Sequence, residues 1–232
     1  ARVDRRRRLD TARNHTATHL LQWALRKVLG DHVRQAGSEV SSERLRFDFT
    51  HPGALTAEEK QAVEQLVNDR VFDDAPVAAQ ETTLDKARQA GAMALFGEKY
   101  GDVVRMLSIG DFSKELCGGT HLERTSQVGL MKIVGEESVA AGVRRITAVT
   151  GRAAAAYVVE EEALLDAVAD GLKANRNSLL SRVESLQSQI KQLKQDLQKA
   201  KSQATRGGSD DLFAHVQDAA VEIGRASCRE RV

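Results

Sequence analysis

The chain has 232 residues, enough for one sizeable core with an appendage or for two small domains. Its 41% hydrophobic and 29% charged residues are typical of a globular protein, and no apolar run reaches the ~20 residues that a membrane-spanning helix needs. The formal charge of only +1 means that any RNA contact must depend on local basic patches. With two cysteines and no signal peptide, the sequence predicts a cytoplasmic protein without a disulfide framework.

The first two thirds of the chain alternate between helix and strand patterns. Apolar residues at a 3–4 spacing predict a helix over residues 9–30, and a capping box at Thr56 and Glu59 opens a second one. Residues 37–49 read as a β-hairpin. Further elements are a short helix over 84–92 and strands over 76–83, 102–110, 129–138 and 142–151. The expected fold class is α+β, with a mixed or antiparallel sheet and packed helices, in a domain ending near Gly151.

After Gly151 the composition changes to one typical of long helices. Apolar residues then step by alternating intervals of four and three, which is the seam of a coiled coil: Leu179, Val183, Leu186, Ile190, Leu193, Leu197, Ala200 and Ala204. Polar residues 173–177 interrupt the pattern. We expect an antiparallel helical hairpin that turns there, with a single long helix as the alternative.

Both ends of the chain carry signs of a larger protein. Residues 205–211 contain glycine and serine and predict a linker, followed by the start of a further domain. The closing residues 222–232 resemble a translated sequencing adapter and are set aside as a non-native tail. Because the sequence opens without a methionine, we expect a fragment of a longer chain.

Two pairs of metal-binding residue types stand about a hundred positions apart. His15 and His19 are four residues apart on the predicted helix, which puts their rings on one face about 6 Å from each other. This face lies opposite the helix's apolar stripe, so we expect the pair off the main core face. Cys117 and His121 are also four apart, with two glycines between them. Each pair alone is a weak signal, but three histidines and one cysteine together suit Zn²⁺.

Several longer segments carry a resemblance to a known family. They are RNHTATHLL, QAGSEV, LRFDF, GAMALFGEKYGDVVRMLSIGDFSKELCGGTH and AAGVRRITAVTG. Residues 9–152 resemble the editing domain of alanyl-tRNA synthetase, and residues 153–205 resemble the helical coiled-coil arm that follows it in that family. Threonyl-tRNA synthetases share the two pairs but lack this arm. A free-standing editing protein of the alanyl type is a further alternative.

The resemblance implies a division of the chain. Residues 1–8 would end a preceding linker, 9–152 would form the editing domain with its zinc site, and 153–205 would form the arm. Residues 206–221 would contain a linker and the start of a C-terminal domain. The ATP-dependent aminoacylation domain would lie outside this chain, and a homo-oligomer formed through the C-terminal region is left open.

The implied activity is zinc-dependent hydrolysis of the ester that links serine or glycine to alanine tRNA. The resemblance assigns His15, His19, Cys117 and His121 as zinc ligands. It also places Thr18 and Gln35 beside Cys117 in the catalytic pocket; without it they read as a helix-surface threonine and a loop glutamine. The competing interpretation is a non-catalytic, zinc-stabilised module for tRNA binding and oligomerisation.

Two further features bear on this interpretation. Four protein ligands close a tetrahedral zinc site, whereas a catalytic zinc keeps a position open for water. Hydrolysis therefore requires that one ligand leaves, that a fifth position opens, or that water is activated elsewhere.

Residues 5–8 are four consecutive arginines, expected to form a solvated face that contacts tRNA only by neutralising phosphates.

Overall fold

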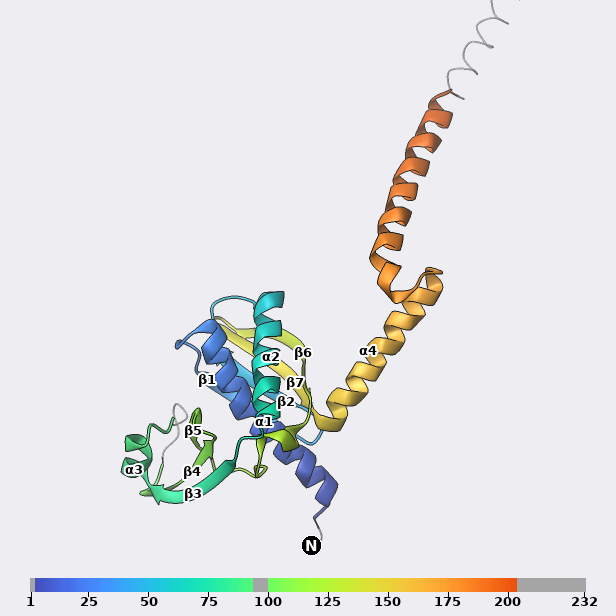
Figure 1. Cartoon of the computed structure of the whole chain (residues 1–232). Helices are drawn as coiled ribbons and strands as arrows, with labels where there is room; N and C mark the ends of the chain where they lie inside the picture. Colours follow the sequence, from blue (N-terminus) through green and yellow to red (C-terminus); the bar gives the residue numbers. More distant parts are fainter. Residues whose placement is uncertain (1–2, 94–99, 204–232) are drawn as a thin grey trace, which may run out of the picture. The chain divides into compact units, whose positions relative to one another are not determined.

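The computed structural model describes residues 3–93 and 100–203 (Figure 1). It divides into two compact units between Glu161 and Glu162. All pairings between named strands in the described residues are antiparallel, and helices pack beside them. The predicted α+β class is therefore confirmed, and the antiparallel form of the sheet is the one present.

A four-stranded sheet forms the larger part of the first unit. Its strands lie in the order β1-β2-β7-β6, with bounds Gln35–Val40 for β1, Leu45–Thr50 for β2, Met131–Ala140 for β6 and Val143–Thr150 for β7. In β2, every second side chain enters the core: Leu45, Phe47 and Phe49 are fully buried. This alternation is the period-two pattern that predicted the hairpin.

Helices α1 (Arg5–Leu29) and α2 (Ala57–Phe72) pack against each other and against this sheet (Figure 1). The predicted capping box of α2 is present, with Thr56 and Glu59 each binding the other's backbone N–H. Helix α1 begins four residues before the predicted start. Asp4 is the reason, because its carboxylate accepts hydrogen bonds from the backbone N–H groups of Arg6 and Arg7.

A second, three-stranded sheet has the order β3-β4-β5. Its elements are β3 (Val77–Thr83), α3 (Leu84–Gln89), β4 (Val103–Ile109) and β5 (Ser113–Leu116), followed by the 3₁₀ helix η1 (Thr125–Val128). It has a small core of its own, made by Ala87, Val104, Met106 and Leu116. The sequence did not predict β5, because a four-residue strand buried at three positions shows no alternation.

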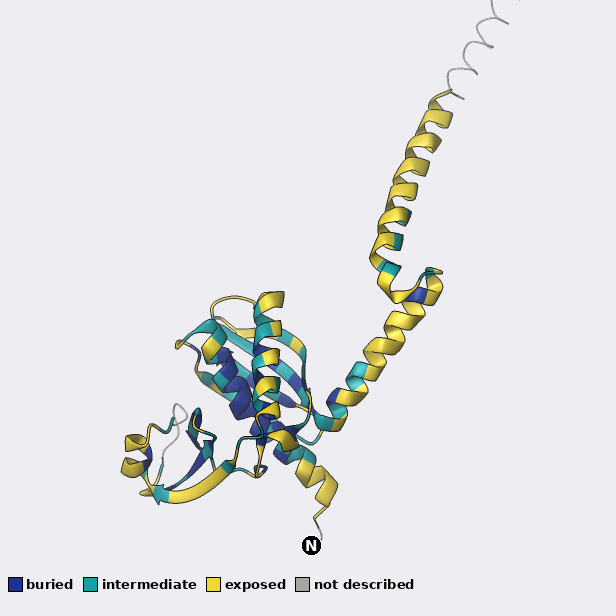
Figure 2. Ribbon diagram, viewed as in Figure 1, coloured by how far each residue is buried: buried dark blue, intermediate teal, exposed yellow. Residues whose placement is uncertain are grey.

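Helix α1 is buried on more than one side. Its apolar stripe enters the main core, as predicted. The expectation that both histidines lie off the core is wrong for His19, which is only 6% exposed, and holds in part for His15, which is half-buried. The reason is that α1 contacts β5 of the second sheet as well as β7 of the first, so its polar side is covered too (Figure 2).

Beyond the sheets the chain continues as two helices. α4 spans Gly151–Gly171, and residues 179–203 form the second helix. Between them Asn175 caps the short 3₁₀ helix η2 (Arg176–Ser178) by accepting a hydrogen bond from Ser178 N. The break falls where residues 173–177 predicted it, so the single-helix alternative is wrong.

The expected packing of these two helices against each other is not found among the described residues. The seam side chains of Ile190, Leu193 and Leu197 are 52%, 67% and 58% exposed, whereas an antiparallel hairpin would bury them. A pairing of this seam with another helix stays a prediction. The expected linker over 205–211 and the tail over 222–232 lie outside the described residues. Among the described helices, none combines the length and apolar character needed to cross a bilayer.

The exposed seam predicts that the arm and the first unit respond separately to mutation. Replacing Leu186 and Leu193 by Glu adds charge to the seam alone. We expect the free energy of unfolding of the first unit to change by less than about 0.5 kcal/mol, as for ordinary surface substitutions. Thermal unfolding followed by circular dichroism checks this, with Gln187→Glu and Gln195→Glu, off the seam, as the matched control. A lower melting temperature of the first unit in the leucine variant alone would contradict it.

Candidate metal centre

Four side chains from two segments converge beside α1. His15 and His19 come from consecutive turns of that helix, and Cys117 and His121 come from the loop that follows β5. One donor atom from each of the four lies within 4.8 Å of the others. The sulfur of Cys117 is 3.4 Å from Nε2 of His15 and 3.2 Å from Nε2 of His121. The whole set that the sequence singled out is therefore assembled in one place.

The spacing of these donors is close to that of a tetrahedral metal site. Bonds of about 2.0–2.3 Å to zinc place the donors of such a site roughly 3.5 Å apart. The widest separation, 4.8 Å, would close by roughly 1 Å, which side-chain rotation can supply. The ring centroid of His121 is 4.3 Å from that of His15 and 5.0 Å from that of His19, so no backbone segment separates the ligands.

A buried carboxylate fixes the orientation of His19. Nδ1 of His19 is 2.6 Å from Oε2 of Glu115 on β5, and both side chains are less than 10% exposed. The other ring nitrogen, Nε2, is buried and has no hydrogen-bond partner in the described residues. A buried polar atom without a partner is costly. Because Nε2 is the ligand atom left free, the donor set fits a metal ion, and a carboxylate behind a ligating histidine is the usual supporting arrangement.

The loop that carries Cys117 and His121 is held from both sides. Arg105 on β4 donates hydrogen bonds to the carbonyl oxygens of Cys117, at 3.0 Å, and Gly119, at 2.6 Å. A Cβ atom on Gly119 would lie 1.9 Å from Cε1 of His15, so only glycine allows the backbone to approach this closely. Of the two glycines between Cys117 and His121, Gly119 is therefore required on steric grounds.

The charges of the cluster are strongly coupled. Burial alone would lower the pKa of His19, but the Glu115 carboxylate and the Cys117 sulfur raise that pKa to about 10. Burial of the Cys117 thiol opposes its ionisation, but hydrogen bonds from His121 and His15 and the nearby charge of His19 lower its pKa to about 3. Burial, with the charges of His19 and His15, lowers the pKa of His121. Without a metal, the cluster therefore holds a thiolate beside an imidazolium, and a bound cation would displace the proton of His19.

A small cavity of about 60 Å³ adjoins the cluster. Thr18 and Gln35, the two pocket residues assigned by resemblance, both line it. Thr18 is 4% exposed and donates its hydroxyl proton to the carbonyl of Asn14, which leaves its oxygen free to accept. Gln35 is the first residue of β1, and its amide donates to Ser38. At ~30 Å³ per liquid water, the cavity has room for roughly two water molecules.

Two residues of this site were missed by reasoning from the sequence. Glu115 lies two positions before Cys117, but only the docking of β5 on α1 reveals that it reaches His19. Gln22 lines the cavity one helical turn after Thr18, and its buried Oε1 has no partner in the described residues. The four-residue interval from Thr18 was the available signal. The arginines at 5–8 are exposed in the first turn of α1, as expected.

Comparison with known proteins assigns part of the first unit to a class. Residues 104–147, which run from β4 to β7, match the family described as the threonyl and alanyl tRNA synthetase second additional domain. The chain therefore carries a domain of aminoacyl-tRNA synthetases.

Similarity along most of the chain points to one kind of synthetase among its relatives. It is 52% identical to an alanine–tRNA ligase of Acetivibrio thermocellus over 223 residues, which is 96% of this chain and 25% of that protein. Alanine–tRNA ligases of Lysinibacillus sphaericus and Nitrosococcus oceani are 56% and 52% identical over 79% and 93% of the chain. The chain is a homologue of a segment of the alanine–tRNA ligases, as the resemblance predicted, and spans about a quarter of the length of such relatives.

The contact between Glu115 and His19 predicts the effect of a single substitution. Glu115→Gln keeps the shape of the side chain but removes its charge, so His19 becomes a weaker ligand. We expect zinc affinity to fall roughly 10- to 100-fold, as for other residues that support metal ligands.

Competition with a chelator measures this affinity, and circular dichroism verifies that the variant is folded. Glu123→Gln is the matched control, because Glu123 is exposed. Equal zinc affinity in both variants would mean that Glu115 only neutralises the protonated His19.

Proposed function

We propose that this cluster is the zinc-dependent editing site of an alanine–tRNA ligase, and that it hydrolyses the ester joining serine or glycine to the 3′-terminal adenosine of alanine tRNA. The cavity carries the proposal, since about 60 Å³ of space lies directly beside four converging metal ligands. The relatives' identity as alanine–tRNA ligases supports alanine tRNA as the partner named here.

The limited selectivity of a binding site between similar amino acids explains why such a reaction is needed. A site that accepts alanine cannot expel glycine, which is smaller, and it rejects the added hydroxyl of serine only weakly. A second site that removes the wrong products supplies the missing discrimination. Water adds to the ester carbonyl and the bond to the ribose oxygen breaks, which releases the amino acid and restores the hydroxyl of the tRNA.

The cavity offers two oxygen acceptors to a small polar amino acid. The oxygen of Thr18 has already donated its proton to Asn14 and accepts from the hydroxyl of serine. Oε1 of Gln22, buried and without a partner among the described residues, accepts from an N–H of the α-amino group. The small volume excludes large side chains, so size and hydrogen bonding together define the substrate.

The four ligands have distinct surroundings. His19 is held by Glu115, whereas His15 and His121 have no carboxylate partner within hydrogen-bond distance among the described residues. A zinc ion in this cluster would supply a Lewis acid that holds the substrate's α-amino group or raises the acidity of a water molecule. Cys117 contributes the negative charge of the donor set, so its removal is the sharpest test.

Cys117→Ala tests the proposal directly. The native chain should contain about one zinc ion and should hydrolyse serine-charged alanine tRNA. The variant should lose the zinc and at least about a hundredfold in rate, the upper end of the losses caused by residues that merely support ligands. Elemental analysis and the release of labelled serine give the two readouts.

Cys228→Ala, which removes the other cysteine of the chain, is the matched control and should keep both properties. Unfolding of the Cys117 variant together with loss of zinc would favour the non-catalytic, zinc-stabilised module. Full activity in metal-free protein would rule out a zinc-dependent reaction.

Thr18→Val tests how serine is distinguished from alanine. Valine keeps the shape of threonine but removes the oxygen that accepts from the serine hydroxyl. We expect the preference for serine-charged over alanine-charged tRNA to fall by about 1–3 kcal/mol, the cost of an unsatisfied buried group. That energy corresponds to roughly 5- to 150-fold in the ratio of the two hydrolysis rates.

Thr11→Val is a closely matched control, since Thr11 also donates to a carbonyl four residues earlier on α1 but lines no cavity found among the described residues. It should leave the ratio unchanged. If Thr18→Val also leaves it unchanged, selectivity lies elsewhere, and Gln35 is the next position to vary.

A further inference from the structure

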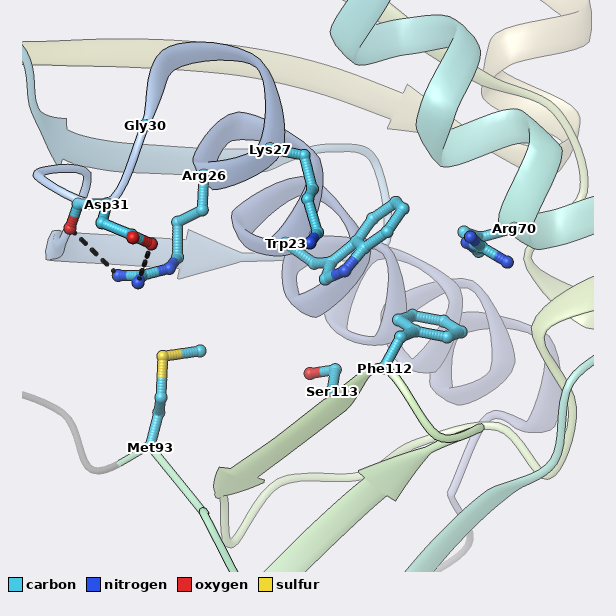
Figure 3. Close-up of a pocket in the computed structure, with 9 residues that line it drawn as sticks. All are labelled: Trp23, Arg26, Lys27, Gly30, Asp31, Arg70, Met93, Phe112 and Ser113. Carbon is cyan, nitrogen blue, oxygen red and sulfur yellow. Dashed lines mark hydrogen bonds and ion pairs between the residues drawn. The ribbon is translucent and has the colours of Figure 1, made fainter.

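A second and larger cavity lies farther along α1 than the metal ligands (Figure 3). Its volume is about 580 Å³, within the range of roughly 300–1,000 Å³ typical of small-molecule sites. Among the residues that line it are Trp23, Lys27, Arg70, Met93, Phe112 and Ser113. None of the steps proposed above uses this cavity.

Flat side chains form one wall of the cavity. The rings of Trp23 and Phe112 are 5.1 Å apart between centroids and inclined by 55°. The guanidinium carbon of Arg70 lies 4.8 Å from the Trp23 ring and 4.9 Å from the Phe112 ring. Figure 3 shows the three groups from α1, α2 and the segment before β5 facing the same space. Aromatic rings and guanidinium planes are the surfaces on which unpaired nucleobases stack.

Three basic side chains and one acidic side chain line this cavity. Arg26 and Arg70 line the cavity, but each forms an ion pair, with Asp31 and Asp73 respectively, both at 2.6 Å. Lys27 is exposed and makes no ion pair among the residues that the structure describes. Figure 3 labels it among the residues that line the cavity. A phosphate group bound there would meet a cation that is not already neutralised.

The two cavities are neighbours on α1 and share one lining residue. Met93 lines both of them. Trp23 follows His19 by one turn of α1, a rise of about 6 Å, which a ribose can span. Ser113, which lines the larger cavity, donates a 3.1 Å hydrogen bond to Glu115, whose other oxygen binds His19. A nucleotide in the larger cavity is thus within reach of the metal ligands.

We propose that the larger cavity binds the 3′-terminal nucleotide of a single-stranded RNA end. The base lies against Trp23, Phe112 and Arg70, and a phosphate lies near Lys27. The ester on the ribose then points toward the cluster. This inference rests on the proposed function, because it assigns the nucleotide part of the same substrate.

Trp23 is the single tryptophan of the chain, so its fluorescence reports on this cavity directly. The complete chain is titrated with a short single-stranded RNA that ends in a free 3′ adenosine. A second titration uses the same RNA without its last base. We expect the first RNA to change the fluorescence and to bind at least about fivefold more tightly, because stacking on an aromatic surface is lost with the base.

Lys27→Ala tests the phosphate contact. Loss of one such contact should weaken binding and reduce the slope of log affinity against log salt by about 0.7. Lys86→Ala is the matched control, since Lys86 is an exposed lysine of α3 that lines neither cavity. It should leave both the affinity and the slope unchanged.

Hydrolysis of serine-charged tRNA is measured in parallel to separate the two proposals. Hydrolysis by the native chain with equal fluorescence responses to both RNAs would overturn this inference and leave the proposed function standing. A response that requires the terminal base, without hydrolysis, would support the cavity and count against the proposed function. No response to either RNA would also overturn the inference.

Discussion

The buried contact between Glu115 and His19 is the interaction on which the site depends. It joins α1, which packs on the larger sheet, to β5 of the smaller one, across 2.6 Å and with almost no exposure to solvent. Two charged groups are buried at a cost that only good geometry and further hydrogen bonds offset. Ser113 supplies one such bond to the carboxylate. The same contact selects which nitrogen of His19 faces the other ligands.

Neighbouring residues hold the Cys117 loop close to α1 and so keep the four ligands together. Arg105 and Gly119 bring the Cys117 loop close to α1, and Thr16 accepts a hydrogen bond from Leu122 N at the far end of that loop. Both cavities follow from the same arrangement, since each lies between α1 and residues near β5. A chain that uses one helix as the shared wall of two sites can hold two parts of a single ligand at a fixed separation.

Much of this could be predicted from the sequence, and the exceptions share one cause. The β1-β2 hairpin and the ligand pairs were predictable because spacing within one element determines which side chains share a face. The burial of His19, the role of Glu115 and the free oxygen of Gln22 were not. Each depends on the docking of the smaller sheet, which involves residues about a hundred positions apart, and no periodicity encodes that distance. The packing of the two arm helices against each other, which the seam led us to expect, is not found among the described residues, because a seam specifies a partner helix without naming which one.

The origin of the four donor side chains has a consequence for assembly. Two come from α1 near the start of the chain, and two come from a loop that belongs to the smaller sheet. The complete set exists only after the two sheets have come together. Affinity for a cation and the docking free energy of the sheets are therefore thermodynamically linked. While the smaller sheet is undocked, the two pairs lie apart, and each offers a cation no more than two of the four ligands.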